Sequence, residues 1–228
     1  DQRDDEEQKP GTMTKVAIIC TSASDLNGHK TGIWYEELAA PYYIFKDGGC
    51  EIVIASIQGG DPPVDAASMG GDFIKPECCQ RALKDAAFEE AKKSSVAVGD
   101  LNADDLAGVF LVGGHGVCAD FIGEPAKDLV ALIEKLTAQD KVVAATCHGV
   151  FGFFDCKTAD GAALIKGKKC TGFCDSEEAA VGLTATVPFT PEARMRDLGA
   201  VYEKAADWSP FVVADGKLVT GQNPASST

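Results

Sequence analysis

Four short apolar runs are the feature that most constrains the fold of this chain. They occupy residues 15–20 (KVAIIC), 51–56 (EIVIAS), 108–112 (GVFLV) and 141–145 (KVVAA). The runs do not alternate between apolar and polar residues, which is typical of strands buried on both faces of a parallel sheet. Segments with helical spacing of apolar residues lie between them, as at 34–46 and 125–138. This order predicts an α/β fold with a doubly wound, mostly parallel sheet sandwiched by helices.

Local signals predict the remaining organisation. Residues 211–213 and 218–220 flank an Asp-Gly pair, which indicates a hairpin with a tight turn. The Gly-, Pro- and Asp-rich stretch 58–76 has neither helical nor strand periodicity, so we expect a long loop that forms a lid or rim. Residues 1–12 carry five acids and two bases without an apolar run, and we expect an acidic disordered tail or cloning remnant there. The rest, 13–228, is expected to form a single domain.

Charge and cysteine content limit the partners and the compartment. The chain has 228 residues, and 21 Lys+Arg against 35 Asp+Glu give a net charge of −14, which argues against nucleic acid or an anionic membrane as partner. No stretch approaches the roughly 20 apolar residues of a membrane-spanning helix. The nine cysteines are an odd number, too sparse for a disulfide scaffold. They predict free thiols in a reducing compartment and hence a cytoplasmic location.

The segment after the fourth run has the pattern of a nucleophile elbow. Ala145 and Gly149 are small residues two positions before and after Cys147, as a tight strand-to-helix turn requires. Ligands of open parallel sheets bind beyond the carboxyl ends of the strands. A thiol there, at a helix N-terminus, is expected to favour the thiolate. The alternatives are that Cys147 is a small buried apolar residue and that His148, whose side chain need not face its neighbour, only fills a helical turn.

Two other segments place polar groups at strand ends. The run 113–116 (GGHG) follows the third strand with little side-chain bulk, so the Gly114 amide could support an oxyanion. It could equally be a tight turn with His115 as a hydrogen-bonding prop. Glu37 has Ile33 and Trp34 one helical turn before it, which places its carboxyl on the apolar side of the helix. A buried carboxyl near a thiol can exchange a proton at neutral pH.

These motifs together resemble the DJ-1/ThiJ/PfpI superfamily, and in particular its heat-shock chaperone and glyoxalase III branch. The resemblance extends from Lys15 to the C-terminus. Besides the elbow and the GGHG run, it rests on residues 31–37 (TGIWYEE), 166–169 (KGKK), 171–173 (TGF) and 219–226 (VTGQNPAS). It implies a class I glutamine-amidotransferase-like, flavodoxin-type fold.

The resemblance also implies roles for the residues singled out above. Cys147 would be the nucleophile, His148 its general base, and Glu37 the acid beside the thiol. Gly114 and His115, with His148, would contact the substrate or its oxyanion.

The branch places its triad carboxylate a few residues beyond the Thr-Gly-Phe segment. This sequence offers three acids there, and counting from Phe173 favours Glu178 over its neighbour Glu177 and over Asp175.

The implied activity is the internal redox and hydration of a 2-oxoaldehyde such as methylglyoxal. A hemithioacetal on Cys147 would lead to lactate without glutathione, as in a lyase of the D-lactate dehydratase type that serves methylglyoxal detoxification under stress. We expect no cofactor and no metal, because the three histidines and the cysteine pairs do not match zinc spacing. A homodimer is expected.

Two other function classes stay open. One is a stress-inducible holdase chaperone that binds unfolded client proteins, with the cysteine incidental or a redox sensor. The other is a cysteine peptidase, amidase or deglycase that uses the same Cys-His-acid set.

Overall fold

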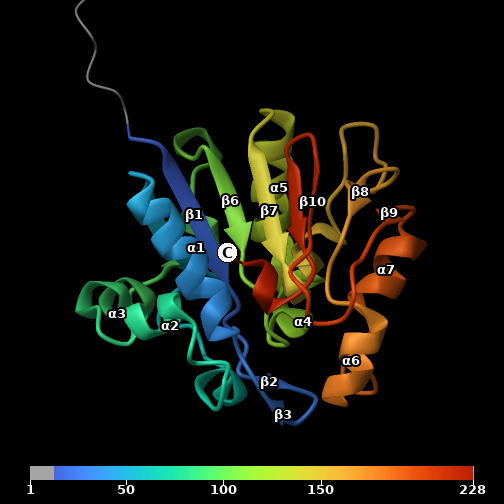
Figure 1. Cartoon of the computed structure of the whole chain (residues 1–228). Coiled ribbons are helices and arrows are strands. Elements are labelled where there is room, and N and C mark those ends of the chain that lie inside the picture. Colours follow the sequence, from blue (N-terminus) through green and yellow to red (C-terminus); the bar gives the residue numbers. More distant parts are fainter. Residues whose placement is uncertain (1–12, 228) are drawn as a thin grey trace, which may run out of the picture.

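Seven strands form a central sheet in the order β10-β11-β7-β6-β1-β4-β5. The computed structural model describes residues 13–227, so the acidic stretch 1–12 lies outside the described part (Figure 1). Every neighbouring pair is parallel except β10 and β11. The predicted doubly wound, mostly parallel sheet is confirmed. Its strands are β1 (Lys15–Cys20), β4 (Glu51–Ser56), β5 (Val96–Ala97), β6 (Gly108–Leu111), β7 (Val142–Thr146), β10 (Val212–Asp215) and β11 (Leu218–Gly221).

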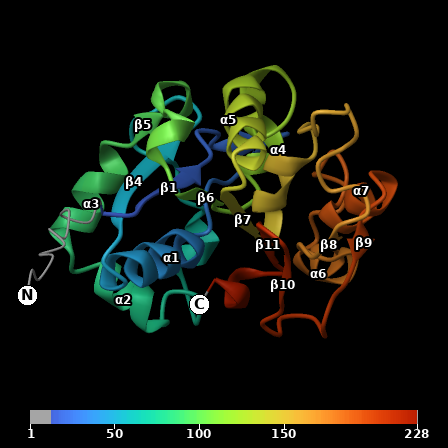
Figure 2. The same ribbon diagram turned by 90° about the horizontal axis from the view of Figure 1, so that it is seen from above.

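Helices cover both faces of this sheet. Seen from above, α1 and α2 lie on one side of the sheet, α4 and α5 lie on the other, and α6 and α7 gather beyond β10 and β11 (Figure 2). The helices are α1 (Tyr35–Asp47), α2 (Glu77–Ala82), α3 (Ala86–Lys93), α4 (Val117–Asp120), α5 (Lys127–Ala138), α6 (Asp175–Val181) and α7 (Pro191–Asp197). No helix among residues 13–227 is both long enough and apolar enough to cross a bilayer.

Short elements complete the fold. Two small sheets pair β2 (Asp25–Leu26) with β3 (His29–Lys30) and β8 (Lys169–Cys170) with β9 (Val201–Tyr202). The 3-10 helices are η1 (Ala66–Met69), η2 (Val98–Asp100), η3 (Ala103–Asp105), η4 (Glu124–Ala126), η5 (Cys147–Phe153) and η6 (Pro224–Ser226).

The burial of β1 explains why the apolar runs do not alternate. Ala17 and Ile19 belong to the core beneath α5, whereas Ile18 and Cys20 belong to the core beneath α1. Both faces of the strand are therefore covered, and every position in it favours an apolar residue. The predicted helices at 34–46 and 125–138 are confirmed as α1 and α5, and the predicted hairpin as β10 and β11.

The long stretch 58–76 is held against the chain that enters α1. The Ile33 amide donates to the carbonyl of Pro63, and the Asp65 amide donates to the carbonyl of Ile33. Gly32 is required at this contact, because a Cβ on it would lie 2.2 Å from the Pro63 oxygen. The loop therefore has a fixed path near the carboxyl ends of the strands, as expected for a rim.

Candidate active site

A sharp turn at Cys147 joins β7 to η5. The backbone of Cys147 is in the left-handed region with φ of 56°, which an ordinary side chain rarely adopts. Gly149 allows the turn to pack on β6, because a Cβ there would lie 2.4 Å from the carbonyl oxygen of Leu111. This is the geometry of the predicted elbow, and it places the thiol at the carboxyl end of the sheet.

The thiol of Cys147 faces the imidazole of the next residue. Sγ lies 3.3 Å from Nδ1 of His148, whose Nε2 lies 2.7 Å from Oε2 of Glu178. The His148 ring is fully buried and packs against His115 and Phe173, with centroid distances of 4.1 Å and 4.6 Å. The structure thus brings the predicted cysteine, histidine and acid into one chain of hydrogen bonds.

Glu178 binds both histidines through one carboxylate. Its second oxygen, Oε1, lies 2.9 Å from Nε2 of His115. An ionised carboxylate only accepts, so both histidines donate from Nε2, and a neutral His148 leaves its Nδ1 as an acceptor. His115 is therefore the hydrogen-bonding prop that the sequence left open, although it also borders the pocket described below. Among the three candidate acids, Glu178 is the one that contacts His148.

Burial sets the charge state of this set. Burial lowers the pKa of His148 to about 4, with His115 adding to the effect and Glu178 opposing it. Burial would raise the pKa of Glu178, but the hydrogen bonds from His115 and His148 outweigh it and lower that pKa to about 2. At neutral pH the site therefore holds a neutral His148 beside an ionised Glu178.

Glu37 reaches the same thiol from the first turn of α1. Its side chain is fully buried, and Oε2 accepts a hydrogen bond of 2.9 Å from the Gly113 amide. Residue 113 must be glycine for Glu37 and Cys147 to lie this close, because a Cβ there would lie 2.4 Å from Oε2 of Glu37 and 3.0 Å from Cβ of Cys147. Within residues 13–227 the other oxygen, Oε1, is buried and has no hydrogen-bond partner.

The protonation states of Glu37 and Cys147 differ from the sequence-based expectation that Cys147 is a thiolate. Burial raises the pKa of Glu37 to about 8, although the thiol and the Gly113 amide oppose the shift. Burial also raises the pKa of the Cys147 thiol well above its usual value, with the nearby Glu37 charge next in size. The His148 amide at the start of η5 lowers it, but by less. The predicted thiolate is wrong for the free site, where a neutral thiol faces a neutral imidazole.

A pocket of about 200 Å³ opens over Cys147. The side chains around it are mostly apolar, and the Gly114 amide and His115 also border it. Within residues 13–227 the Gly114 amide donates no hydrogen bond. It is therefore available to donate one to a substrate oxygen, as the sequence predicts. The apolar wall consists of Trp34, Phe73, Phe173, Val181 and Trp208.

Several residues of the pocket carried no usable signal in the sequence. Trp208 and Phe73 lie in irregular segments whose position depends on tertiary contacts. Asn223 belongs to the segment 219–226 that carried part of the resemblance, although nothing in the sequence assigned it to the pocket. Glu177 was considered only as a triad acid, yet it binds the chain near Trp208 instead.

One group in the described part of the chain has the spacing of a metal site. The ligand atoms of His115, His148 and Glu178 lie within 4.8 Å of one another. Both Nε2 atoms already bond to the Glu178 carboxylate, so a cation would have to replace two hydrogen bonds and two protons. Absence of a metal cofactor stays a prediction.

Two relatives with known names match this sequence over nearly their whole length. The glutathione-independent glyoxalase HSP31 of Saccharomyces cerevisiae is 34% identical, with 93% of each chain covered. Glyoxalase 3 of Candida albicans is also 34% identical, with 94% of each chain covered.

Solved structures agree with the sequence relatives. The crystal structure of glyoxalase III from Candida albicans superposes with a TM-score of 0.86 at 32% identity, covering 94% of this chain and 93% of that one. The Rapid Encystment Protein 24 KDa of Francisella tularensis gives a TM-score of 0.88 at 33% identity, covering 95% of each chain. The DJ-1/PfpI family model matches residues 31–228, which include α1 with Glu37, the elbow and α6. With its elbow cysteine set at the end of a parallel strand, this chain belongs to the DJ-1/PfpI family.

Proposed function

We propose that this chain is a glutathione-independent glyoxalase that converts a 2-oxoaldehyde, such as methylglyoxal, into a 2-hydroxy acid. The observation that carries the proposal is the thiol of Cys147, 3.3 Å from a neutral His148 and beside Glu37, whose pKa is about 8. A soft nucleophile, a base and a carboxyl that exchanges protons near neutral pH are the groups this chemistry needs. The names of the relatives support the same activity.

The first step joins the aldehyde carbon to the protein. Sγ of Cys147 forms a C–S bond to the aldehyde carbon, and the π electrons of the carbonyl move to its oxygen. The thiol proton passes to Nδ1 of His148 and then to that oxygen, which gives a hemithioacetal. Glu178 stabilises the transient imidazolium through its 2.7 Å hydrogen bond. The Gly114 amide, which borders the pocket, can support the developing oxyanion.

The second step moves protons within the substrate and leaves its electrons there. The Glu37 carboxylate removes the proton of the former aldehyde carbon; the electron pair of that C–H bond forms a C=C bond, and the π electrons of the ketone move to its oxygen, which gives an enediolate. Glu37 returns the proton to the neighbouring carbon, and the hydroxyl proton of the former aldehyde carbon passes to the former ketone oxygen, so the aldehyde carbon is oxidised to a thioester while the ketone carbon is reduced to an alcohol. Water then cleaves the thioester to the hydroxy acid and restores the thiol of Cys147. The balance is internal and uses no external oxidant.

Glu37 suits the second step because its pKa lies near the working pH. A carboxylate with an ordinary pKa would be a weak base, whereas a group that titrates near pH 8 can both take and return the proton. Its unpartnered Oε1 is the oxygen available for this contact.

The direct test is lactate formation from methylglyoxal in the absence of glutathione. We expect the purified protein to form lactate, read separately for the D and L forms, and Cys147→Ser to abolish the reaction. Cys50→Ser is the matched control, because Cys50 is a free, partly exposed cysteine that does not line the pocket. A wild-type protein that forms no lactate would overturn the proposal.

The same preparation separates the competing functions. Suppression of client aggregation without lactate formation would favour the holdase, whereas peptide cleavage that is lost in Cys147→Ser would favour a peptidase. All nine cysteines are free thiols, which supports the proposed reducing, cytoplasmic setting. The homodimer stays a prediction for analytical ultracentrifugation.

A further inference from the structure

Trp208 occupies a strained position at the mouth of the pocket. Its backbone φ is 62°, in the left-handed region that a bulky aromatic residue rarely adopts. Such backbone conformations persist only where surrounding contacts enforce them, and they concentrate at ligand-binding sites. The side chain is 49% exposed and packs edge-on against Phe173 at a centroid distance of 5.8 Å. Phe173 in turn covers the ring of His148.

A buried carboxylate holds Trp208 in this conformation. Glu177 is fully buried, and its Oε1 accepts hydrogen bonds of 2.8 Å from the Trp208 amide and from Nδ2 of Asn223. Its Oε2 accepts a bond of 3.2 Å from the Cys174 amide. Asn223 also borders the pocket and donates to the carbonyl of Ser209, on the far side of Trp208. Glu177 therefore links α6 to both flanks of the tryptophan.

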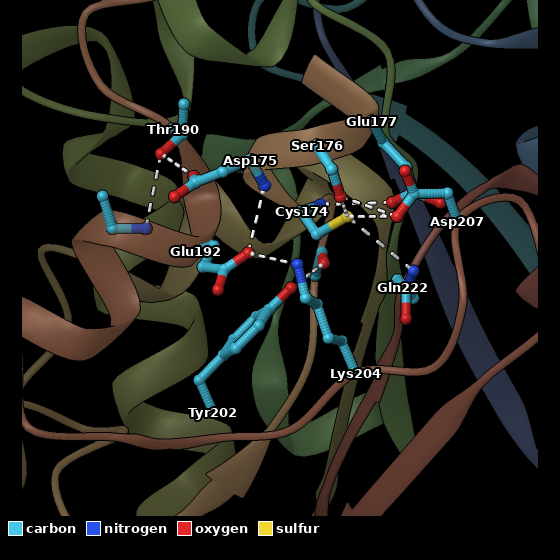
Figure 3. A network of polar contacts seen from close by, with 12 residues as sticks. Cys174, Asp175, Ser176, Glu177, Thr190, Glu192, Tyr202, Lys204, Asp207 and Gln222 are labelled. Atoms are coloured by element: carbon cyan, nitrogen blue, oxygen red, sulfur yellow. Dashed lines mark hydrogen bonds and ion pairs between the residues drawn. The ribbon is translucent and has the colours of Figure 1, made fainter. Parts of the chain in front are cut away.

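A second contact ties the preceding residue to the same helix. Oδ1 of Asp207 accepts a hydrogen bond of 2.6 Å from Oγ of Ser176, and the thiol of Cys174 lies 3.5 Å from the same oxygen. Figure 3 shows Ser176 and Cys174, at the start of α6, pointing towards Asp207. One helical turn thus carries the acid that binds His148 and the groups that hold the pocket wall.

A second pair of aromatic side chains also lines the pocket. Trp34 and Phe73 meet edge to face at a centroid distance of 5.0 Å, and Phe73 is about half exposed. The pocket volume of about 200 Å³ far exceeds the roughly 10–15 Å³ that holds one water molecule. The methyl group of methylglyoxal would leave most of this apolar space unfilled, whereas a flat ring could contact several of the aromatic side chains that line the pocket.

Building on the proposed glyoxalase activity, we propose that Trp208 is a specificity-determining residue and that Glu177 is its positioning residue. Together they shape the pocket for 2-oxoaldehydes whose ketone carbon carries a flat apolar group, such as an aryl ring. Glu177 is suited to this task because a carboxylate can accept from all three N–H donors around it.

The test compares phenylglyoxal with methylglyoxal as substrates. We expect wild type to have the higher kcat/KM with phenylglyoxal, and Trp208→Ala to lower the phenylglyoxal-to-methylglyoxal ratio at least about tenfold, mainly through the KM for phenylglyoxal. Glu177→Gln should lower the ratio in the same way, because its single carbonyl oxygen cannot serve three donors. Val201→Ala, a similarly exposed apolar residue away from the pocket, should leave the ratio unchanged. A ratio that neither Trp208→Ala nor Glu177→Gln changes would overturn the proposal.

A binding measurement separates this proposal from the glyoxalase activity. The chain has two tryptophans, so Trp208 is the sole tryptophan in a Trp34→Phe background, and excitation selective for tryptophan reports on it alone. Acetophenone, an unreactive aryl ketone, should quench this emission saturably, and the quenching should weaken severalfold in Glu177→Gln. If the protein forms product from neither aldehyde, only the glyoxalase proposal is refuted. If acetophenone does not quench saturably, the proposal that Trp208 binds an aryl group is refuted. If Glu177→Gln fails to fold by circular dichroism, Trp208→Ala still decides the substrate ratio.

Discussion

Sγ of Cys147 lies 3.3 Å from Nδ1 of His148, although the two residues are neighbours in the chain. Adjacent side chains ordinarily point apart, and they meet here at the sharp turn that Cys147 makes with a φ of 56°. The other ring nitrogen of His148 binds Glu178, so the nitrogen facing the thiol is an acceptor. The strained backbone of Cys147 thus brings its thiol to the ring nitrogen of His148 that the hydrogen bond to Glu178 leaves as an acceptor.

Replacing Glu178 tests this coupling. In Glu178→Gln one oxygen becomes an NH₂ group, so one of the two histidine N–H donors loses its acceptor and His148 is pushed towards the wrong tautomer. We expect kcat/KM for the 2-oxoaldehyde to fall by about 10⁴-fold, the order seen when a catalytic histidine loses its orienting carboxylate. Steady-state kinetics measure this. Glu192→Gln, a buried glutamate outside the pocket, should cost less than about tenfold, and a similar loss in both variants would contradict the assigned role.

Glu37→Gln should raise the free energy of unfolding above that of wild type at high pH. The Glu37 pKa rises from an ordinary value of 4.5 to about 8 on folding, so between these values the folded state binds the extra proton. The wild-type free energy of unfolding therefore falls as pH rises through this window, by up to roughly 1.4 kcal/mol per pH unit. Gln resembles the protonated acid and avoids this loss. Urea unfolding should show the variant more stable than wild type at pH 8 and nearly equal at pH 5; parallel pH curves would contradict the buried carboxyl.

The pH dependence of kcat/KM should report the ionisation of Glu37 and Cys147. Glu37 and Cys147 face each other with raised pKa values, and loss of a proton from either one supplies the base or the nucleophile. We expect kcat/KM to rise between pH 6 and pH 9 with an apparent pKa near 8. His148 should not limit the rate there, because burial lowers its pKa to about 4. A rate that falls across this range would show that the active form is the protonated one.

The elbow should tolerate no side chain at position 149. In Gly149→Ala the new Cβ would lie 2.4 Å from the carbonyl oxygen of Leu111, so η5 or β6 must shift. We expect a loss of about 1–3 kcal/mol in the free energy of unfolding, measured by urea titration, together with reduced activity. Gly70→Ala is the matched control, because the carbonyl oxygen of Ala67 would lie 3.8 Å from its new Cβ and its φ is negative. Equal stability of the two variants would argue against the close packing of the elbow.

Metal removal should leave the activity unchanged. His115, His148 and Glu178 have metal-like spacing, but their hydrogen bonds already satisfy the carboxylate. We expect dialysis against EDTA to leave kcat with methylglyoxal the same, as measured by lactate formation. Loss of activity that an added divalent cation restores would contradict the cofactor-free mechanism.

The sequence located much of this site because local patterns carry the information. A tight strand-to-helix turn needs small residues around its nucleophile, so Ala145 and Gly149 were enough to indicate the elbow. The apolar neighbours of Glu37 one turn earlier on α1 likewise predicted its burial. In both cases the signal is a rule of backbone geometry, and it acts within a few residues.

Only the family resemblance favoured Glu178 over Glu177 in the sequence, and no local pattern could confirm the choice, because a step of one residue on a helix turns a side chain by about 100°. The position of α6 against His115 and His148 decides which of the two acids joins the triad and which holds Trp208.

The sequence by itself therefore determined the sheet, the elbow and the buried acid. Only the tertiary structure decided the charge states and the pocket wall. Burial outweighs the helix N-terminus at Cys147 and raises its pKa, and desolvation depends on everything packed around the thiol. Trp208 reaches the pocket through contacts between segments far apart in the chain, such as the hydrogen bond that its amide donates to Glu177, which no local pattern encodes.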